Sequence, residues 1–253
     1  EFFKLGGLQY LDAISIHPYT QPSPPGVMVQ QLEGLKTLIR KYNNGQLIPI
    51  YSTEFGWSTQ EGGNTEKQEA DYLVRGYVLQ LASGIEKIYM YDLMNDGIET
   101  ANNEHNFGML HNLKDPLGAY TPKPAYAAYA AMTRQLTGWK FNSKDSTSSN
   151  LYSYLFKQDQ AKTRVVWATR DTLAAIAANG PLQVTDLMGN TETLVPYQGY
   201  VYVTITNEPR YIKGDMSGIH ESAEFQLTGE DGILGDPVSM MLNVQYGGSF
   251  AIS

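Results

Sequence analysis

The sequence contains no cysteine and only 4 histidines among its 253 residues. The absence of cysteine excludes disulfides, thiolate metal sites and a cysteine nucleophile, but it does not fix the compartment. There is no run of Lys and Arg that could follow a phosphate backbone, and 18 basic against 26 acidic residues give a net charge of −8, so nucleic acid is not an expected partner. No apolar stretch approaches the roughly 20 residues that span a bilayer, so a membrane is not an expected partner either.

Several enzyme classes are excluded because their short motifs are missing. The sequence has no Gly-x-Ser-x-Gly elbow, no His-Glu-x-x-His zinc helix and no glycine-rich phosphate loop. Residues 92–103 match a calcium loop poorly, because Met94 stands at a ligand position and Asn103 replaces the last Glu. We therefore expect neither a metal nor a cofactor.

Hydrophobic residues make up 42% of the chain, enough to bury a core, and the aromatic residues include 18 Tyr. Tyrosine has an apolar face and a polar tip, which suits both sugar contacts and exposed sheet faces. The chain begins at Glu1 without a start Met or a signal peptide and stops just after a strand-like run. We therefore expect it to be a fragment of a longer protein.

The first half of the sequence has the pattern of an α/β protein. Short apolar runs at 11–17, 47–54 and 85–91 predict parallel strands, and each is followed by an amphipathic stretch that predicts a helix. The second of these helices opens with the capping box Thr65-x-x-Gln68. Parallel strands have their C-terminal ends at the same edge of the sheet, here called the strand mouth. His17, Glu54 and Asp92 are therefore expected to lie together at the strand mouth.

After Gly138 the pattern changes to short alternating stretches. Those at 151–156, 163–169, 182–187 and 200–206 predict strands of an antiparallel sheet. The sequence therefore predicts an α/β region over 1–138, an all-β region over 139–213 and the start of a further β element over 214–253. The clearest strand of this last element is expected at 237–246.

Five segments together resemble a known family more specifically than any of them does alone. They are Asp-Ala-Ile-Ser-Ile-His-Pro-Tyr at 12–19, Thr-Glu-Phe-Gly-Trp at 53–57, the stretch 91–97, Phe-Gly at 107–108 and Lys-Pro-Ala-Tyr at 123–126. This succession resembles the later part of a retaining (β/α)8-barrel glycoside hydrolase, of the large clan of cellulases, mannanases and β-xylosidases. On this resemblance residues 1–138 hold the last three strands of a TIM barrel, strands 6 to 8, and the β region is similar to a small accessory β-sandwich domain.

The resemblance implies hydrolysis of O-glycosidic bonds in a polysaccharide or oligosaccharide, by a secreted, extracellular bacterial enzyme. It assigns the nucleophile to the Glu that ends the seventh strand, here Glu54. Polar and aromatic residues at the three strand ends are expected to bind the sugar. They are His17, Tyr19, Trp57, Tyr91, Asp92, Asn95 and Asp96.

A retaining glycosidase needs a second carboxyl group as acid and base, and in this family it ends strand four. That strand is not in the sequence. Asn207-Glu208-Pro209 matches the family's acid/base tripeptide but ends an alternating run of the β region, which indicates a plain strand end. Glu104 follows Asn103 in a loop, where a substrate contact or a loop role is expected. The chain alone is therefore expected to be inactive and to need the missing N-terminal barrel half, from the same gene or a separate chain.

Other interpretations compete with this one. The whole chain could be a non-catalytic carbohydrate-binding protein with a degenerate half barrel. Glu54 could be a salt-bridged strand-end acid, His17 and Tyr19 could be structural, and Trp57 could cover the barrel rim. An open set of three strands is also expected to expose its apolar inner face. That face is expected to consist of Ile14, Ile16, Ile48, Ile50, Ile88 and Met90.

Overall fold

The computed structural model describes residues 1–145, 147–222, 225–229 and 240–244. It begins with a parallel three-stranded sheet in the order β1-β2-β3. The strands are β1 (Ile14–Ile16), β2 (Ile50–Ser52) and β3 (Lys87–Ile88), each shorter than the apolar run that predicts it. Helices α1 (Gly26–Tyr42), α2 (Glu66–Ala82) and α3 (Pro124–Leu136) follow the three strands in turn. The predicted α/β alternation is therefore confirmed.

Short 3-10 helices, η1 (Gly7–Tyr10) and η2 (Asn103–Asn106), precede β1 and follow β3. The predicted capping box is present at the start of α2. The Thr65 hydroxyl accepts from the Gln68 amide N–H at 3.1 Å, and the Gln68 side chain accepts from the Thr65 amide N–H at 2.9 Å. Within the described ranges, no helix has the length and hydropathy needed to cross a bilayer.

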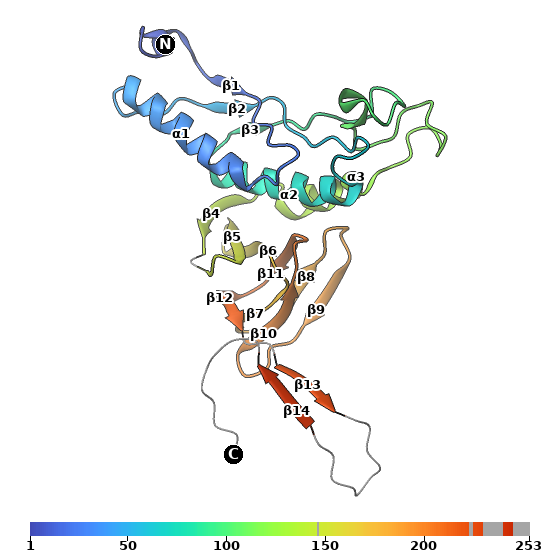
Figure 1. Ribbon diagram of the computed structural model, residues 1–253. Coiled ribbons are helices and arrows are strands. Elements are labelled where there is room, and N and C mark those ends of the chain that lie inside the picture. Colours follow the sequence, from blue (N-terminus) through green and yellow to red (C-terminus); the bar gives the residue numbers. More distant parts are fainter. Residues whose placement is uncertain (146, 223–224, 230–239, 245–253) are drawn as a thin grey trace, which may run out of the picture.

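All three helices lie on the same side of the parallel sheet (Figure 1). The isoleucines of the strands face these helices, where Ile50 is 4% exposed and Ile14, Ile16 and Ile88 pack against the same core. The opposite face carries Ser15, paired in register with Tyr51, which is paired in turn with Lys87.

The expected bare apolar face is therefore wrong. Strand side chains alternate between the two faces, and the apolar set packs against the helices, where Ile50 is buried and the other five residues are partly buried. Ile48 and Met90, which flank the strands, also pack against this core. The exposed face is polar and aromatic, so the chain does not forfeit the burial of six aliphatic side chains.

The rest of the chain forms antiparallel sheets. A six-stranded sheet has the order β4-β5-β6-β11-β8-β9, and a three-stranded sheet has the order β10-β7-β12. The strands of the first are β4 (Lys140–Lys144), β5 (Leu151–Gln158), β6 (Ala161–Ala168), β8 (Leu182–Thr185), β9 (Thr191–Leu194) and β11 (Arg210–Lys213). Those of the second are β7 (Thr172–Ala178), β10 (Tyr200–Ile205) and β12 (Met216–Ser222).

The four alternating stretches correspond to β5, β6, β8 and β10. Strand β7 was not predicted, because its Thr-Leu-Ala-Ala-Ile-Ala-Ala sequence lacks alternation: it lies between two partners and is buried along most of its length. Side chains of both sheets, among them Val166, Ile176 and Ile212, share one apolar core.

Residues after 213 are not all part of a further element. Strand β12 pairs antiparallel with β7, so 216–222 belong to the three-stranded sheet. A hairpin of β13 (Phe225–Gly229) and β14 (Met240–Val244) follows. The predicted strand at 237–246 corresponds to β14, and its remaining residues lie outside those described.

The two regions share a core, although the change of pattern at Gly138 marks the point where helix gives way to strand. Tyr154, Trp167 and Tyr211 belong to the same apolar cluster as residues of α2 and α3. Figure 1 shows the helices between the parallel sheet and the antiparallel strands. The residue boundaries of separate domains stay a prediction.

Thr65→Ala is expected to lower the free energy of unfolding by about 1 kcal/mol, because it leaves the Gln68 amide N–H without its acceptor. Urea denaturation of both proteins measures the difference. Gln68→Ala, which removes only the reciprocal bond, is the matched control and should cost less. A loss for Thr65→Ala no greater than that for Gln68→Ala would contradict the assignment.

Candidate functional site

A hollow of about 300 Å³ lies at the C-terminal ends of β1 and β2, beside the segment that follows β3. Glu54 lies two residues after β2 and lines it, so the expected acid is placed at the mouth of the strands. The other lining residues come from the loops that follow the strands. They are Tyr19, Gln21, Tyr91, Asn103, Glu104 and Phe107.

Two predicted residues touch the Glu54 carboxylate. The Tyr19 hydroxyl donates to Oε2 at 3.1 Å, and His17 Nδ1 lies 3.3 Å from the same oxygen. Burial first, and then the negative charge of Glu54, raise the pKa of Tyr19 far above its ordinary value, so Tyr19 keeps its proton and stays a donor. The carboxylate is half-buried, with 40% of its side chain exposed, and open to a ligand.

A chain of polar contacts behind His17 fixes its ring. His17 Nε2 lies 3.0 Å from Thr53 Oγ1, and Thr53 Oγ1 lies 2.5 Å from Ser15 Oγ. Ser15 and Thr53 come from neighbouring strand segments. The parallel sheet itself therefore sets the orientation of the imidazole toward Glu54.

The glycine of the Glu-Phe-Gly motif has a steric reason. A Cβ on Gly56 would collide with the Tyr91 carbonyl oxygen, and the Tyr91 amide N–H donates to the Phe55 carbonyl at 2.9 Å. The backbone after β3 thus lies directly against the backbone after β2. This close approach brings Tyr91 to the hollow that holds Glu54.

Aromatic rings form one wall of the hollow. Tyr19 and Tyr91 both pack edge-on against Phe107, with ring centroids 5.8 and 5.4 Å away. The Tyr91 hydroxyl donates to Asp96 Oδ2 at 3.1 Å. Asp96 is exposed and does not line the hollow, so its sugar contact stays a prediction.

Gln21 is a lining residue that the sequence did not single out. Its Oε1 accepts from the Ser58 amide N–H at 2.9 Å, and its Nε2 donates to Asn103 Oδ1 at 3.1 Å. Asn103 in turn donates to Glu104 Oε1 at 3.1 Å. A glutamine in a proline-rich loop gives no local signal for this position, because the three bridged segments are distant in sequence.

Two expected sugar ligands are corrected. Trp57 is 1% exposed, packs edge-on against Phe55 and Tyr72, and donates through Nε1 to the Ser23 carbonyl at 3.0 Å. Asn95 is 3% exposed and accepts from the Gly108 amide N–H at 2.9 Å. Both side chains are buried and make their polar contacts inside the protein, so they do not face a substrate.

Asp92 is not among the residues that line the hollow. Its Oδ1 is buried and has no hydrogen-bond partner in the described part of the chain. Burial, and then the negative charge of Asp96, raise the pKa of Asp92 to about 6. Within the same ranges, no group of three or more His, Asp or Glu side chains is placed to hold a metal ion.

A buried ion pair lies between the strand-end loops and the helices. Lys123 Nζ lies 3.6 Å from Glu69 Oε2, and both side chains are 0% exposed. The ammonium group also donates to Thr59 Oγ1 at 2.9 Å and to the Asn106 carbonyl at 3.1 Å. Burial raises the pKa of Glu69 and lowers that of Lys123. The sequence showed Lys123 only as part of a motif and did not indicate Glu69.

The tripeptide Asn207-Glu208-Pro209 lies against α2. Glu208 pairs with Lys67 of that helix at 2.5 Å, and the Asn207 carbonyl accepts from Arg75. These contacts support the interpretation of a plain strand end. Glu208 is not among the residues that line the hollow of Glu54.

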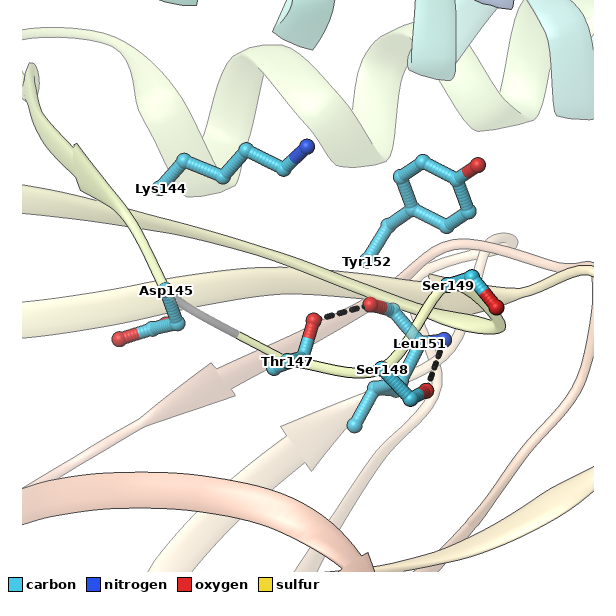
Figure 2. Close-up of a pocket in the computed structure, with 7 residues that line it drawn as sticks. All are labelled: Lys144, Asp145, Thr147, Ser148, Ser149, Leu151 and Tyr152. Atoms are coloured by element: carbon cyan, nitrogen blue, oxygen red, sulfur yellow. Dashed lines mark hydrogen bonds between the residues drawn. The ribbon is translucent and has the colours of Figure 1, made fainter.

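A separate hollow of about 460 Å³ lies on the β region (Figure 2). Lys144 and Tyr152 project to one side of the strands, whereas Thr147 and Ser148 lie on the other. None of its lining residues belongs to the strand mouth.

Comparison with solved structures identifies the fold. The chain superposes on a family 39 glycoside hydrolase from the gut symbiont Bacteroides cellulosilyticus WH2 with a TM-score of 0.71 and 25% identity, over 83% of this chain and 46% of that one. The fold is that of the C-terminal part of a glycoside hydrolase barrel.

More distant glycoside hydrolases share this fold. A family 30 endoxylanase from Clostridium papyrosolvens C71 has a TM-score of 0.51 and 12% identity, over 82% of this chain and 50% of its own. A family 86 β-porphyranase from Bacteroides plebeius has a TM-score of 0.54 and 11% identity, over 90% and 45%. The chain spans about half the length of these glycoside hydrolases. No protein-family model and no curated protein matches the sequence.

Lys123→Met is expected to lower the free energy of unfolding by about 3 kcal/mol, because it leaves Glu69 buried without its counter-ion. Urea denaturation at neutral pH measures the loss. The double variant Glu69→Met, Lys123→Met removes both charges and should recover much of it. If the double variant lost as much stability as Lys123→Met and Glu69→Met lose together, the two residues would not be coupled.

Asp92→Asn is expected to raise the free energy of unfolding by about 1 kcal/mol at about pH 8, and by much less at about pH 4. The raised pKa in the folded state means that stability falls as pH rises from the ordinary value of about 4 to about 6. Denaturation at both pH values measures this. Asp12→Asn, at an exposed position, is the control, and its effect on the free energy of unfolding should be smaller than that of Asp92→Asn at about pH 8.

Proposed function

We propose that this chain is the C-terminal part of a retaining glycoside hydrolase and that Glu54 is its nucleophile. The observation that carries the proposal is the Glu54 carboxylate at the strand mouth, in contact with both His17 and Tyr19. Structural similarity to glycoside hydrolases supports the glycosidase-type assignment. The substrate is a polysaccharide or oligosaccharide, met outside the cell by a secreted enzyme.

In this mechanism Glu54 attacks the anomeric carbon, and the leaving sugar departs with the bonding electron pair. Tyr19 and His17 hold Oε2, so the carboxylate is oriented before the substrate arrives. Tyr19, Tyr91 and Phe107 offer an aromatic wall to the sugar ring. Water then attacks the anomeric carbon and gives its proton to the acid/base carboxylate, while the bond to Glu54 breaks and restores the free carboxylate.

The acid/base carboxyl group is expected from barrel strands that are not in this sequence. It must lie about 5 to 5.5 Å from the nucleophile to protonate the leaving oxygen. Glu104 lines the same hollow and is exposed, which suits a hydroxyl contact with the substrate. We propose that the polar sheet face of Ser15, Tyr51 and Lys87 meets the remaining barrel strands, and that the β region is an accessory β-sandwich.

Covalent trapping tests the nucleophile without requiring the missing acid. A dinitrophenyl 2-deoxy-2-fluoroglycoside carries a leaving group that departs unprotonated, so the chain is expected to form a stable ester at Glu54, detected by peptide mass spectrometry. Glycosides with poor leaving groups should be hydrolysed about 10² to 10⁴-fold more slowly than by a barrel with its acid present.

Two variants make this test specific. Glu54→Gln should abolish labelling, and Glu208→Gln should be labelled like the original chain, because Glu208 is tied to Lys67 away from the hollow. An ester on Glu104 or Glu208, or turnover that Glu208→Gln abolishes, would overturn the proposal. Sugar binding without any ester would favour a non-catalytic carbohydrate-binding protein instead.

A further inference from the structure

A cavity of about 510 Å³ lies where the N-terminus of α1 and the middle of α2 meet strands β4, β5 and β6. Its volume is in the range of small-molecule sites. The nucleophile and the other residues of the strand-mouth hollow do not line it. It is therefore a candidate site separate from the one that holds Glu54.

The charge of this cavity is opposite to that of the chain. Arg75 and Lys144 line it, and no acidic side chain of the described residues does, although the net charge of the protein is −8. Such local complementarity favours a negatively charged ligand.

Lys144 is held over the aromatic side of the cavity. Its Nζ lies 5.4 Å from the ring centroid of Tyr152 and 5.8 Å from that of Tyr154. Figure 2 shows Lys144 and Tyr152 projecting to the same side while the neighbouring Asp145 points elsewhere. Asp145 pairs with Arg164 at 2.9 Å, and in the described ranges Lys144 has no carboxylate within 4 Å.

Arg75 supplies a buried cation that forms no ion pair within 4 Å in the described part of the chain. The residue is 8% exposed, and its guanidinium carbon lies 5.9 Å from the Trp167 ring centroid. Nη2 donates to the Asn207 carbonyl, whereas Nε has no partner in the described part of the chain. The nearby Asp71 attracts Arg75 through its charge, but its hydrogen bond, at 2.9 Å, is to Lys67. A buried guanidinium with an unpartnered N–H is costly, so an anionic partner that accepts from Nε would stabilise it.

The first turn of α1 adds a third positive feature. Pro25 at the N-cap provides no side-chain cap, and the first turn contains no acidic residue. Neither the cap nor the first turn of α1 therefore compensates the partial positive charge of this helix N-terminus. Pro25 and Gly26 at this end both line the cavity.

We propose that this cavity binds an anionic pyranose, a sugar ring that carries a carboxylate or a sulfate ester. Lys144, Arg75 and the α1 N-terminus hold the negative group, while Val27, Leu79 and the ring of Tyr152 contact the C–H face of the sugar. The choice of a sugar rests on the proposed function, whereas the preference for an anion rests on the charges alone. The site would hold a charged residue of the polysaccharide away from the nucleophile.

Isothermal titration calorimetry of the 253-residue chain tests this with glucuronic acid, glucose 6-sulfate, glucose and inorganic sulfate. At least one charged sugar is expected to bind about 10-fold or more tightly than glucose and than inorganic sulfate. Preference for glucuronic acid indicates a carboxylate, and preference for glucose 6-sulfate indicates a sulfate ester. Equal affinity for glucose, equal affinity for inorganic sulfate, or no binding would overturn the proposal.

Lys144→Met, at an exposed position, should fold normally and weaken the charged sugar about 10-fold or more. Lys157→Met, on the neighbouring strand and outside the cavity, should leave the affinity unchanged. An equal loss in both would show general electrostatic attraction and overturn the site. Arg75→Met, if it folds, should also weaken binding.

The titration measures binding and does not require hydrolysis. The proposed cavity and the proposed nucleophile can therefore be refuted independently of each other. Glu54→Gln should bind the charged sugar as the original chain does, because Glu54 does not line the cavity. If Glu54→Gln lost this binding, the charged sugar would lie in the strand-mouth hollow and the proposed cavity would be wrong.

Discussion

The loops around the candidate nucleophile depend on one buried ammonium group. Lys123 reaches Thr59 after β2, the Asn106 carbonyl in the loop after β3, and Glu69 on α2, and it is shielded from water. A buried charge costs least when its partners surround it in good geometry. These contacts restrict where the loops can lie, and the loop that contains Asn106 continues directly into Phe107 in the wall of the hollow.

The alternation of side chains along the short parallel strands determines which face of the sheet carries the polar groups. One set of side chains is apolar and packs against the three helices, whereas the other, which includes Ser15 and Tyr51, is polar and faces away. Past the strand ends, Thr53 and His17 continue the polar set toward Glu54. The alternation that directs apolar side chains into the core therefore also directs polar side chains toward the Glu54 carboxylate.

The helices connect two surfaces of different character. On one side they support the sheet whose mouth carries an acidic, aromatic hollow, and on the other they pack against the antiparallel strands around Trp167. Trp167 stacks on Tyr152 and Tyr154 at centroid distances of 5.6 and 5.1 Å. Arg75 of α2 lies over this stack, so the junction that joins the regions also concentrates positive charge.

The sequence by itself determined the strand and helix order of the first half, the capping box of α2 and the position of Glu54 at a strand end, because these depend on periodicity and on neighbours a few residues apart. The tertiary structure alone decided that Trp57 is buried, that Gln21 lines the hollow and that Lys123 pairs with Glu69. Burial and ion pairing depend on segments far apart in the chain, and no local pattern specifies which of them meet.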